Sequence, residues 1–547
     1  MSRHLFSRKL HRLLQRQPSP SRIGCVHDQQ TRKMFWSRGD EDLFRYTSGR
    51  WLWDEDRQLK LRYRKFNVAK LKQFAIDAAG ARTCKSIEKI AEGGSNRVFR
   101  LTLDSGSVIV RVPLVNEAHI SISMASEVAT MEFARTLLGL PVPKVLAWNS
   151  DEGNPAGISY MIMEEAKGKQ LSLIWDDLEL ADKVAIVTQV ANVADTMTSV
   201  RFNTTGNLFF RSTPTAPSCD IQVKDGVPQH GSDHTISRFV MGPSVASGFW
   251  EGGRDCLELD RGPWSSSIDY VRAIGLRELA CAETGKPSLV RARTVMQNQR
   301  EGVNGDTGDI ISLYRKFLEV ADALCPKEPE LDASVLWHWD LRAPNIFVED
   351  NRISAIIDWQ DVWIGPLHLQ AEHPPLIDYD GPQILDMPEE YKSLTDEKER
   401  QRIRDQVCKS LLLYTYEYEM QKRGSVVDSV LHLAHGKTIR ETIYFATHLR
   451  NEGLGPLRQC LMRIEQNWSE IGGDRPCPFA FSAAELEQHY ASAKEWNAEA
   501  DFWDGLDGLV MKDGWTSNED YEDALAFFEG LGEEGRIFLD YKCHPAP

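Results

Sequence analysis

The chain has 547 residues, of which 42% are apolar and 26% are charged, and its formal net charge is −16. This composition is typical of a folded globular protein with about two to four domains, and it excludes a fibrous or disordered chain. The acidic charge argues against general nucleic-acid binding, because the phosphate backbone would be repelled.

No apolar run approaches the roughly 18 residues that a membrane-spanning helix needs, so we predict no transmembrane segment. The ten cysteines include no CxxC pair and no cluster with histidine. Neither a zinc knuckle nor a disulfide framework is therefore predicted.

Residues 1–38 differ from the rest of the chain because they contain nine Lys or Arg and one acid, Asp28. Apolar residues recur there at spacings that could line one helical face opposite arginines. Such an Arg-rich, acid-poor and Ser-containing segment is typical of a mitochondrial transit peptide, and the alternative is a disordered basic tail. The remaining chain carries 55 basic and 79 acidic residues, an excess that favours a cationic substrate.

Residues 39–85 are predicted to form a helical extension, with a helix over 66–79 that packs on the body. Residues 86–165 alternate short apolar runs with turn residues, which predicts a compact lobe of strands and one helix. We expect five strands, at 86–91, 98–103, 108–112, 145–148 and 159–164, and the helix at 123–138.

After an expected hinge at 165–168 the pattern becomes mainly helical, with helices predicted at 180–200, 268–282 and 308–324. The Gly-, Pro- and Ser-rich stretch 203–265 has little periodicity and predicts long loops. A short β segment is expected at 335–358. The resulting division is a transit peptide or disordered segment at 1–38, an extension at 39–85, an N-lobe at 86–165, a C-lobe at 166–380 and a helical C-terminal extension at 381–547.

The most specific pattern is the segment His338 to Val348, followed by the acid Asp358 at the end of an apolar run. Phosphoryl transfer from ATP needs a carboxylate that accepts the hydroxyl proton, and oxygen ligands that hold magnesium on the phosphates. Asp340 lies on a loop where it can face the acceptor, and Asn345 and Asp358 can reach one metal ion. The alternative is a pair of ordinary hairpin acids beside a buried core histidine.

A glycine turn stands between the first two predicted strands and consists of Gly93, Gly94, Ser95 and Asn96. Backbone N–H groups of such a turn can approach nucleotide phosphates, and the two polar side chains add donors. Arg111 lies in the centre of the third strand, where a phosphate-binding cation would stand. Glu127, early in the following helix, is its expected carboxylate partner.

These segments, "EGGSNRVFRL", "HWDLRAPN" and "IIDWQ", resemble the aminoglycoside phosphotransferase and choline-kinase-like family. The resemblance implies an α+β, bilobal protein-kinase-like fold with a five-stranded antiparallel N-lobe and a mainly helical C-lobe. It implies that Asp340 is the catalytic base, that Asn345 and Asp358 bind magnesium, and that Arg111 binds phosphate. It also implies an adenine-binding hinge, which consists of Met163, Glu164, Glu165 and Ala166.

One departure from the family pattern is Arg111, because kinase-type lobes usually place Lys there.

A closer resemblance, to a fungal mitochondrial protein with such a domain, runs through segments that include "RYTSGRWLW" and "YMIMEEAKGKQLSLIWDD". The expected function is ATP- and Mg²⁺-dependent transfer of the γ-phosphate to a hydroxyl of a small molecule in mitochondria, and the acidic charge mildly favours a cationic acceptor. The alternative is a nucleotide-binding pseudokinase that acts as a mitochondrial scaffold. Protein-kinase activity is less expected, since Trp359 and Gln360 replace the usual Phe-Gly.

Overall fold

The structure is a computed structural model that describes residues 40–114, 119–213, 218–225, 236–285, 307–506 and 508–532. The predicted transit segment lies outside these ranges. The chain divides into two compact units, one of Met1–Arg64 with Tyr490–Pro547 and the other of Lys65–His489. The five-part division expected from the sequence stays a prediction.

The first unit joins segments from the two ends of the sequence through one antiparallel pair of strands, β1 and β17. Trp51 and Trp53 are buried in its core, where the Trp53 ring packs edge-on against Phe528. The elements with residues in this unit are η1 (Asp40–Leu43), β1 (Gly49–Trp51), α2 (Glu55–Arg62), α18 (Ala483–Asp504), β17 (Trp515–Ser517) and α19 (Tyr521–Gly530).

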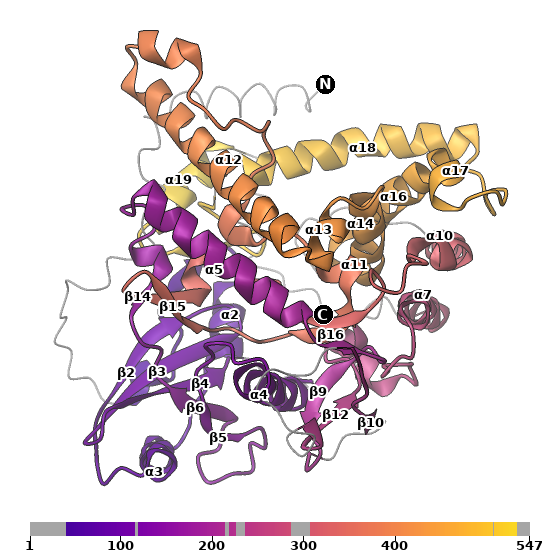
Figure 1. The fold of residues 1–547 in the computed structure, drawn as a ribbon. Helices are drawn as coiled ribbons and strands as arrows, with labels where there is room; N and C mark the ends of the chain where they lie inside the picture. Colours follow the sequence, from indigo (N-terminus) through magenta and orange to yellow (C-terminus); the bar gives the residue numbers. More distant parts are fainter. Residues whose placement is uncertain are drawn as a thin grey trace. The chain divides into compact units, whose positions relative to one another are not determined.

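The N-lobe of the second unit contains an antiparallel sheet of five strands in the order β2-β3-β4-β6-β5, counted over the described residues (Figure 1). Its fully buried side chains on β4 alternate with partly buried ones, as expected for a sheet covered on both faces. The elements are α3 (Val68–Ala79), β2 (Cys84–Glu92), β3 (Asn96–Leu103), β4 (Ser107–Pro113), α4 (Ile120–Thr136), β5 (Val145–Asn149) and β6 (Tyr160–Glu164).

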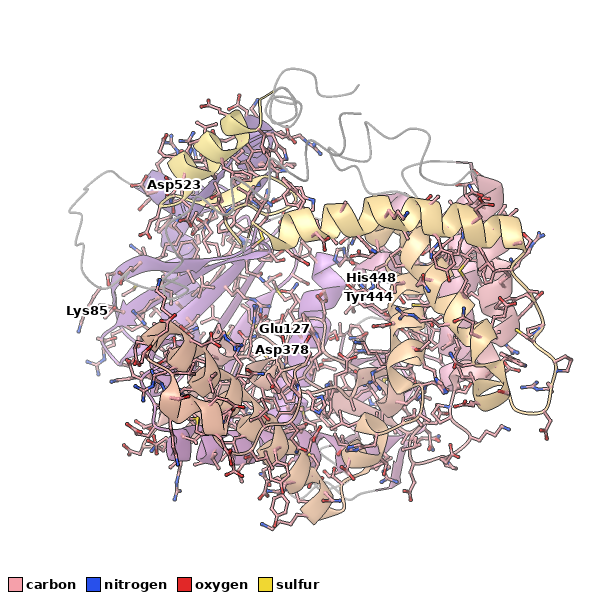
Figure 2. The ribbon with its side chains drawn as sticks, turned by 90° about the horizontal axis from the view of Figure 1, so that it is seen from above. Lys85, Glu127, Asp378, Tyr444, His448 and Asp523 are labelled. Carbon is pink, nitrogen blue, oxygen red and sulfur yellow. The ribbon has the colours of Figure 1, made fainter. Side chains whose placement is uncertain are left out.

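Two helices cover the two faces of this sheet. Helix α3 contacts β2, β3, β4 and β5, and its first turn is capped by Asn67, whose side chain accepts the Lys70 N–H at 3.1 Å. Helix α4 lies on the other face, because its Glu127 bonds to Arg111 of β4. Glu127 is buried, and Figure 2 shows it near the middle of the view, whereas Lys85 of β2 lies at the edge.

The C-lobe is mainly helical and carries short strands around the predicted catalytic loop. Its first half contains β7 (Lys169–Gln170), η2 (Leu171–Leu173), α5 (Leu180–Thr198), β8 (Arg201–Phe202), β9 (Asn207–Phe210), β10 (Cys219–Asp220), β11 (Val223–Asp225), β12 (Phe239–Gly242), η3 (Ser247–Phe249), η4 (Glu251–Cys256), α7 (Ser267–Glu283), α10 (Thr307–Val320) and η5 (Ala321–Leu324). The fold class expected from the sequence, α+β with a five-stranded antiparallel lobe and a mainly helical lobe, is confirmed.

The rest of this lobe begins with the strand that leads into the catalytic loop. It contains β13 (Ser334–Trp337), η6 (Ala343–Asn345), β14 (Ile346–Glu349), β15 (Arg352–Ile356), β16 (Trp363–Pro366), α11 (Leu367–Gln370), η7 (Pro375–Ile377), η8 (Glu389–Ser393), α12 (Glu397–Arg423), α13 (Val426–Leu431), α14 (Gly436–Thr447), α15 (Leu449–Glu452), α16 (Leu454–Gln466) and α17 (Trp468–Ile471). Within the ranges that the structure describes, no helix is both long and apolar enough to span a membrane.

The expectation of long loops over 203–265 is wrong for part of that stretch. Strands β9 and β12 pair there in antiparallel register, and the side chains of Phe209, Phe239 and Met241 are fully buried. A four-residue strand that is buried on both faces shows no alternation of apolar and polar residues, so periodicity could not reveal it. Strand β16 was not predicted for the same reason, because three of its four residues are buried and the strand shows no alternation of apolar and polar residues.

Candidate active site

The predicted catalytic loop follows β13, whose four residues are all buried. His338 connects this loop to the strand before Asp358. Its Nε2 donates to the Ile357 carbonyl at 3.1 Å, and its Nδ1 accepts the Asp340 N–H at 3.3 Å. Only the neutral ring can do both, which agrees with burial that lowers the His338 pKa below its usual value.

Asp340 lies at the centre of the loop with its carboxylate held by two donors. The Asn345 Nδ2 donates to its Oδ2 at 2.8 Å and to its backbone carbonyl at 3.0 Å. The Arg342 Nε lies 3.0 Å from the same Oδ2. These contacts fix the orientation of the carboxylate and leave Oδ1 as the oxygen that can accept an incoming proton.

Asp358 follows β15 and is brought beside the loop by backbone pairing, because the Ile357 N–H donates to the Asn345 carbonyl at 3.0 Å. Its backbone has φ 63°, and Asp361 has φ 60°. A side chain other than glycine in this left-handed region costs of order 1–3 kcal/mol and persists where surrounding structure holds it, most often at functional sites. The conformation therefore makes this turn a candidate functional site.

Arg111 and Glu127 form the ion pair expected from the sequence. The guanidinium donates through Nη1 and Nη2 to both carboxylate oxygens, with the Nη1 to Oε1 distance at 2.5 Å. Burial acts to lower the Arg111 pKa, but the charge and hydrogen bonds of Glu127, together with Asp358 and Asp361, offset it, and the pKa is raised. Arg111 thus stays a cation beside the predicted metal segment.

Asp361 is a site residue that the sequence analysis missed. Burial, followed by the nearby charge of Glu127, raises its pKa to about 6. Since the folded pKa lies above the ordinary value, ionising this group opposes folding, and the free energy of unfolding falls as the pH rises from about 4 to 6. Crowding of carboxylates adds to the effect of burial, because Glu127 and Asp358 both lie close enough to Asp361 to raise its pKa.

This excess of negative charge is what a bound cation would offset. In the described ranges no group of three or more His, Cys, Asp or Glu side chains could hold a metal by itself. A Mg²⁺ ion commonly takes only one or two protein oxygens and obtains the others from phosphates and water. Asn345 and Asp358 supply that number, so the residues present fit the ion.

The glycine turn closes over this segment from the N-lobe. The Gly93 N–H donates to the Asn96 carbonyl at 2.9 Å, and both glycines have open space around them. The Asn96 side chain, expected to face phosphate, donates instead to the Gln360 Oε1 at 2.8 Å. The structure therefore joins the turn to the predicted metal segment through a contact that no local pattern indicated.

The side chains of the expected hinge point to different faces of the N-lobe sheet. Met163 pairs with Ile109, two residues from Arg111 on the same face of β4, whereas Glu164 pairs with Val108 on the other face. The Glu165 carboxylate accepts bonds from Arg100, at 2.7 Å, and from Ser107. An adenine at this hinge would therefore be contacted by the backbone N–H and C=O groups of Glu164, Glu165 and Ala166 rather than by their side chains.

The family model described as the phosphotransferase enzyme family matches residues 86–369, which include every one of these groups. The chain belongs to this family, and the resemblance seen in its motifs is confirmed. A subtelomeric hrmA-associated cluster protein of Aspergillus fumigatus is 30% identical to it over 76% of this chain and 85% of the relative.

Altered inheritance of mitochondria protein 9 from Lachancea thermotolerans, named as mitochondrial, is 26% identical over 74% of this chain and 69% of its own length. The closer resemblance drawn from the sequence was to this protein in fungi, and it is confirmed. An aminoglycoside phosphotransferase solved with ADP and hygromycin B is 14% identical, covers 73% of this chain and 97% of its own, and has a TM-score of 0.33.

Proposed function

We propose that the protein transfers the γ-phosphate of ATP, with Mg²⁺, to a hydroxyl of a small molecule. The observation that carries the proposal is the assembly of Asp340, Asn345 and Asp358, tied together by side-chain and backbone bonds within reach of the Arg111–Glu127 ion pair. A carboxylate, two oxygen ligands and a cation are the groups that phosphoryl transfer requires.

Each residue has one role in this proposal. Asp340 Oδ1 accepts the proton of the acceptor hydroxyl, while Asn345 and Arg342 hold the carboxylate in place. Asn345 and Asp358 hold Mg²⁺, which when bound neutralises charge on the phosphates. Arg111, oriented by Glu127, attracts the phosphate oxygens. Gly93, Gly94 and Ser95 cover the phosphates, and the hinge backbone binds adenine.

The acceptor has a candidate place in a hollow of about 340 Å³ whose lining includes His119, Trp250, Glu251 and Asp255. His119 also lies near Asp361, because its charge acts to lower the pKa of that carboxyl. Arg450 also lines the hollow and lies 3.7 Å from Glu251, and the Arg261 guanidinium lies 4.4 Å from the centre of the Trp250 ring. Asp255 is therefore the carboxylate through which this lining would attract a hydroxyl acceptor that carries an amine, in agreement with the acidic chain.

Two measurements on the full chain test the function. The first is the thermal unfolding temperature with and without ATP and Mg²⁺, and the second is phosphate transfer to a panel of small molecules that carry a hydroxyl group, some of which also carry an amine. We expect stabilisation only when nucleotide and metal are both present, and turnover with an amine-bearing acceptor. No stabilisation by ATP with Mg²⁺ would contradict the proposal.

A second candidate, a nucleotide-binding scaffold with little catalysis, is favoured by one observation. Both terminal nitrogens of Arg111 are bonded to Glu127, and its buried Nε has no hydrogen-bond partner within the part of the chain that the structure describes. The guanidinium is thus poorly available to phosphate in this conformation. ATP binding without turnover on any acceptor would favour this candidate.

Removing the metal ligands should separate their contributions. We expect Asp358→Ala to abolish Mg²⁺-dependent ATP binding more completely than Asn345→Ala, because a carboxylate brings a full charge to the ion and an amide only a dipole. Magnesium titrations followed by calorimetry at fixed ATP measure the difference. Identical titrations for the wild type and Asp358→Ala would remove Asp358 from the metal site.

We also propose that the protein is mitochondrial, since the relatives with the altered-inheritance name are themselves named as mitochondrial and residues 1–38 have the composition of a presequence. The matrix is the expected compartment, because a basic amphipathic segment is drawn by the inside-negative potential.

Residues 1–38 fused to a fluorescent reporter should direct it to mitochondria. Replacing Arg3, Arg8, Arg12 and Arg16 by Glu should leave the reporter in the cytosol, because the charge drawn by the potential is reversed. Microscopy and fractionation measure the distribution. Import of the charge-reversed fusion would show that the address lies elsewhere.

A further inference from the structure

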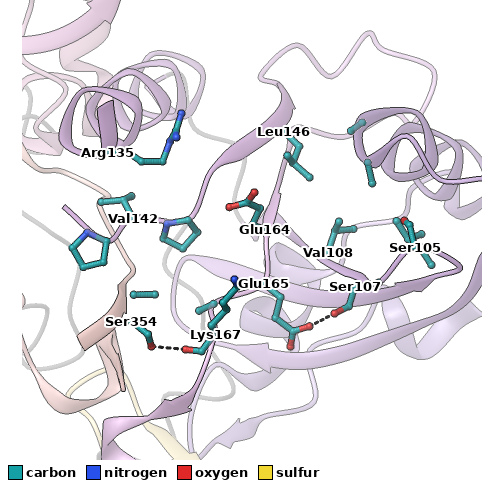
Figure 3. Close-up of a pocket in the computed structure, with 18 of the residues that line it drawn as sticks. Ser105, Ser107, Val108, Arg135, Val142, Leu146, Glu164, Glu165, Lys167 and Ser354 are labelled. Atoms are coloured by element: carbon teal, nitrogen blue, oxygen red, sulfur yellow. Dashed lines mark hydrogen bonds between the residues drawn. The ribbon is translucent and has the colours of Figure 1, made fainter. Parts of the chain in front are cut away.

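A cavity of about 730 Å³ lies behind the hinge, between the end of the N-lobe sheet and the β14–β15 hairpin (Figure 3). Much of its wall is aliphatic and includes Val108, Leu140, Val142 and Leu146. Small-molecule sites commonly have volumes of roughly 300–1,000 Å³ and walls of this kind. The proposed function uses no side chain of this wall.

The cavity is separate from the proposed nucleotide site because the two lie on opposite faces of the sheet. Directly opposed residues of an antiparallel pair share a face, and neighbours along a strand alternate. Val108 opposes Glu164, whereas Ile109 opposes Met163 and Arg111 opposes Met161. Val108 and Glu164 thus line the α3 face, while Arg111 and Met163 belong to the α4 face.

Two opposite charges enter the cavity from the hinge. Figure 3 shows the Glu164 carboxylate and the Lys167 side chain directed into it, whereas Glu165 turns away toward Ser107. Within the described ranges, the Glu164 carboxylate accepts one hydrogen bond, from the Lys144 backbone N–H at 3.2 Å. Among the residues that the structure describes, Lys167 has no ion-pair partner. Arg135 and Glu165 also line the cavity, but each belongs to an ion pair, Arg135 with Glu132 at 2.7 Å and Glu165 with Arg100 at 2.6 Å. Outside these pairs the cavity offers one carboxylate and one ammonium group that are not paired with each other.

We infer that this cavity binds a small apolar zwitterion, a molecule with an ammonium and a carboxylate group on a hydrocarbon body, as in an apolar amino acid or short peptide. The ligand ammonium meets Glu164, its carboxylate meets Lys167, and its hydrocarbon lies on Val142 and Leu146. Because this face of the sheet is not the proposed nucleotide face, the zwitterion and ATP bind together. The inference does not rest on the proposed function.

Binding is measured by calorimetry on the full chain without nucleotide, using leucyl-leucine, its N-acetyl form and its C-terminal amide. We expect the dipeptide to bind and each blocked form to bind about two- to fivefold more weakly, the usual worth of one exposed ion pair. Free leucine carries the same two charged groups as the dipeptide. Comparing its affinity with that of leucyl-leucine shows whether the cavity prefers an amino acid or a peptide. Failure of all four compounds to bind would overturn the inference.

Two substitutions assign the charges. Lys167→Met should make the dipeptide and its amide bind equally, and Glu164→Gln should do the same for the dipeptide and its N-acetyl form. Both side chains are exposed, so the fold should survive, and Lys169→Met and Glu349→Gln are matched exposed controls. Unchanged discrimination in both variants, or competition between the dipeptide and ATP, would refute the assignment to this cavity.

Discussion

Asp340→Asn is expected to lower turnover by about 100-fold or more while ATP affinity stays close to that of the wild type. The amide cannot accept the hydroxyl proton, and loss of a general base typically has this effect. The fold should be preserved, because the amide oxygen can still accept the Asn345 Nδ2–H bond that holds the carboxylate at 2.8 Å. Steady-state kinetics and ATP calorimetry on the same preparation measure the two quantities.

A matched control is Asp350→Asn, the same change at an exposed turn of the β14–β15 hairpin with φ 50°. Asn tolerates this left-handed backbone well. The control should keep both turnover and stability. Wild-type turnover by Asp340→Asn would remove Asp340 from the base role and leave the scaffold as the better candidate function.

Glu127→Ala is expected to lower the free energy of unfolding by about 3–5 kcal/mol, because it leaves the buried Arg111 guanidinium without its partner. Arg111→Met with Glu127→Leu should recover most of this loss, since the variant removes both charges of the buried pair. ATP affinity should stay low in the double variant while adenosine affinity is unchanged. Urea denaturation and competitive nucleotide binding measure stability and affinity separately.

Arg111→Lys is the conservative control for this pair. A lysine keeps the charge but loses the two-pronged contact with Glu127, so part of the ATP affinity should remain. The variant with both Arg111→Met and Glu127→Leu shows whether the pair serves stability alone or also phosphate binding. If it binds ATP as tightly as the wild type, the ion pair serves stability alone and Arg111 does not bind phosphate.

Much of the N-lobe could be predicted because its signals are local. Strand β4 was expected at 108–112 and occupies Ser107–Pro113, and helix α4 was expected at 123–138 and occupies Ile120–Thr136. Alternation, helical spacing and the glycines between strands are written in neighbouring residues. The Arg111–Glu127 pair was also predictable, because the strand and helix that carry it are consecutive.

The contacts that the sequence did not reveal join residues far apart in the chain. Asn96 meets Gln360 only because the sheet end lies over the turn after β15. Asp361 became a site residue through crowding with Glu127, which a motif spacing cannot express. Arg342 stood inside the recognised segment, yet its side chain turns back to Asp340. Three-dimensional proximity, rather than residue type, decides these roles.

The pairing of β1 with β17 has a consequence for biosynthesis. Gly49–Trp51 leaves the ribosome hundreds of residues before Trp515–Ser517, its hydrogen-bonding partner. Domains form during synthesis from the N-terminal side, so the strand that carries Trp51 lacks its partner strand until translation is nearly finished. A nascent chain stalled before residue 515 should therefore be more sensitive to proteolysis near residue 50 than the released protein.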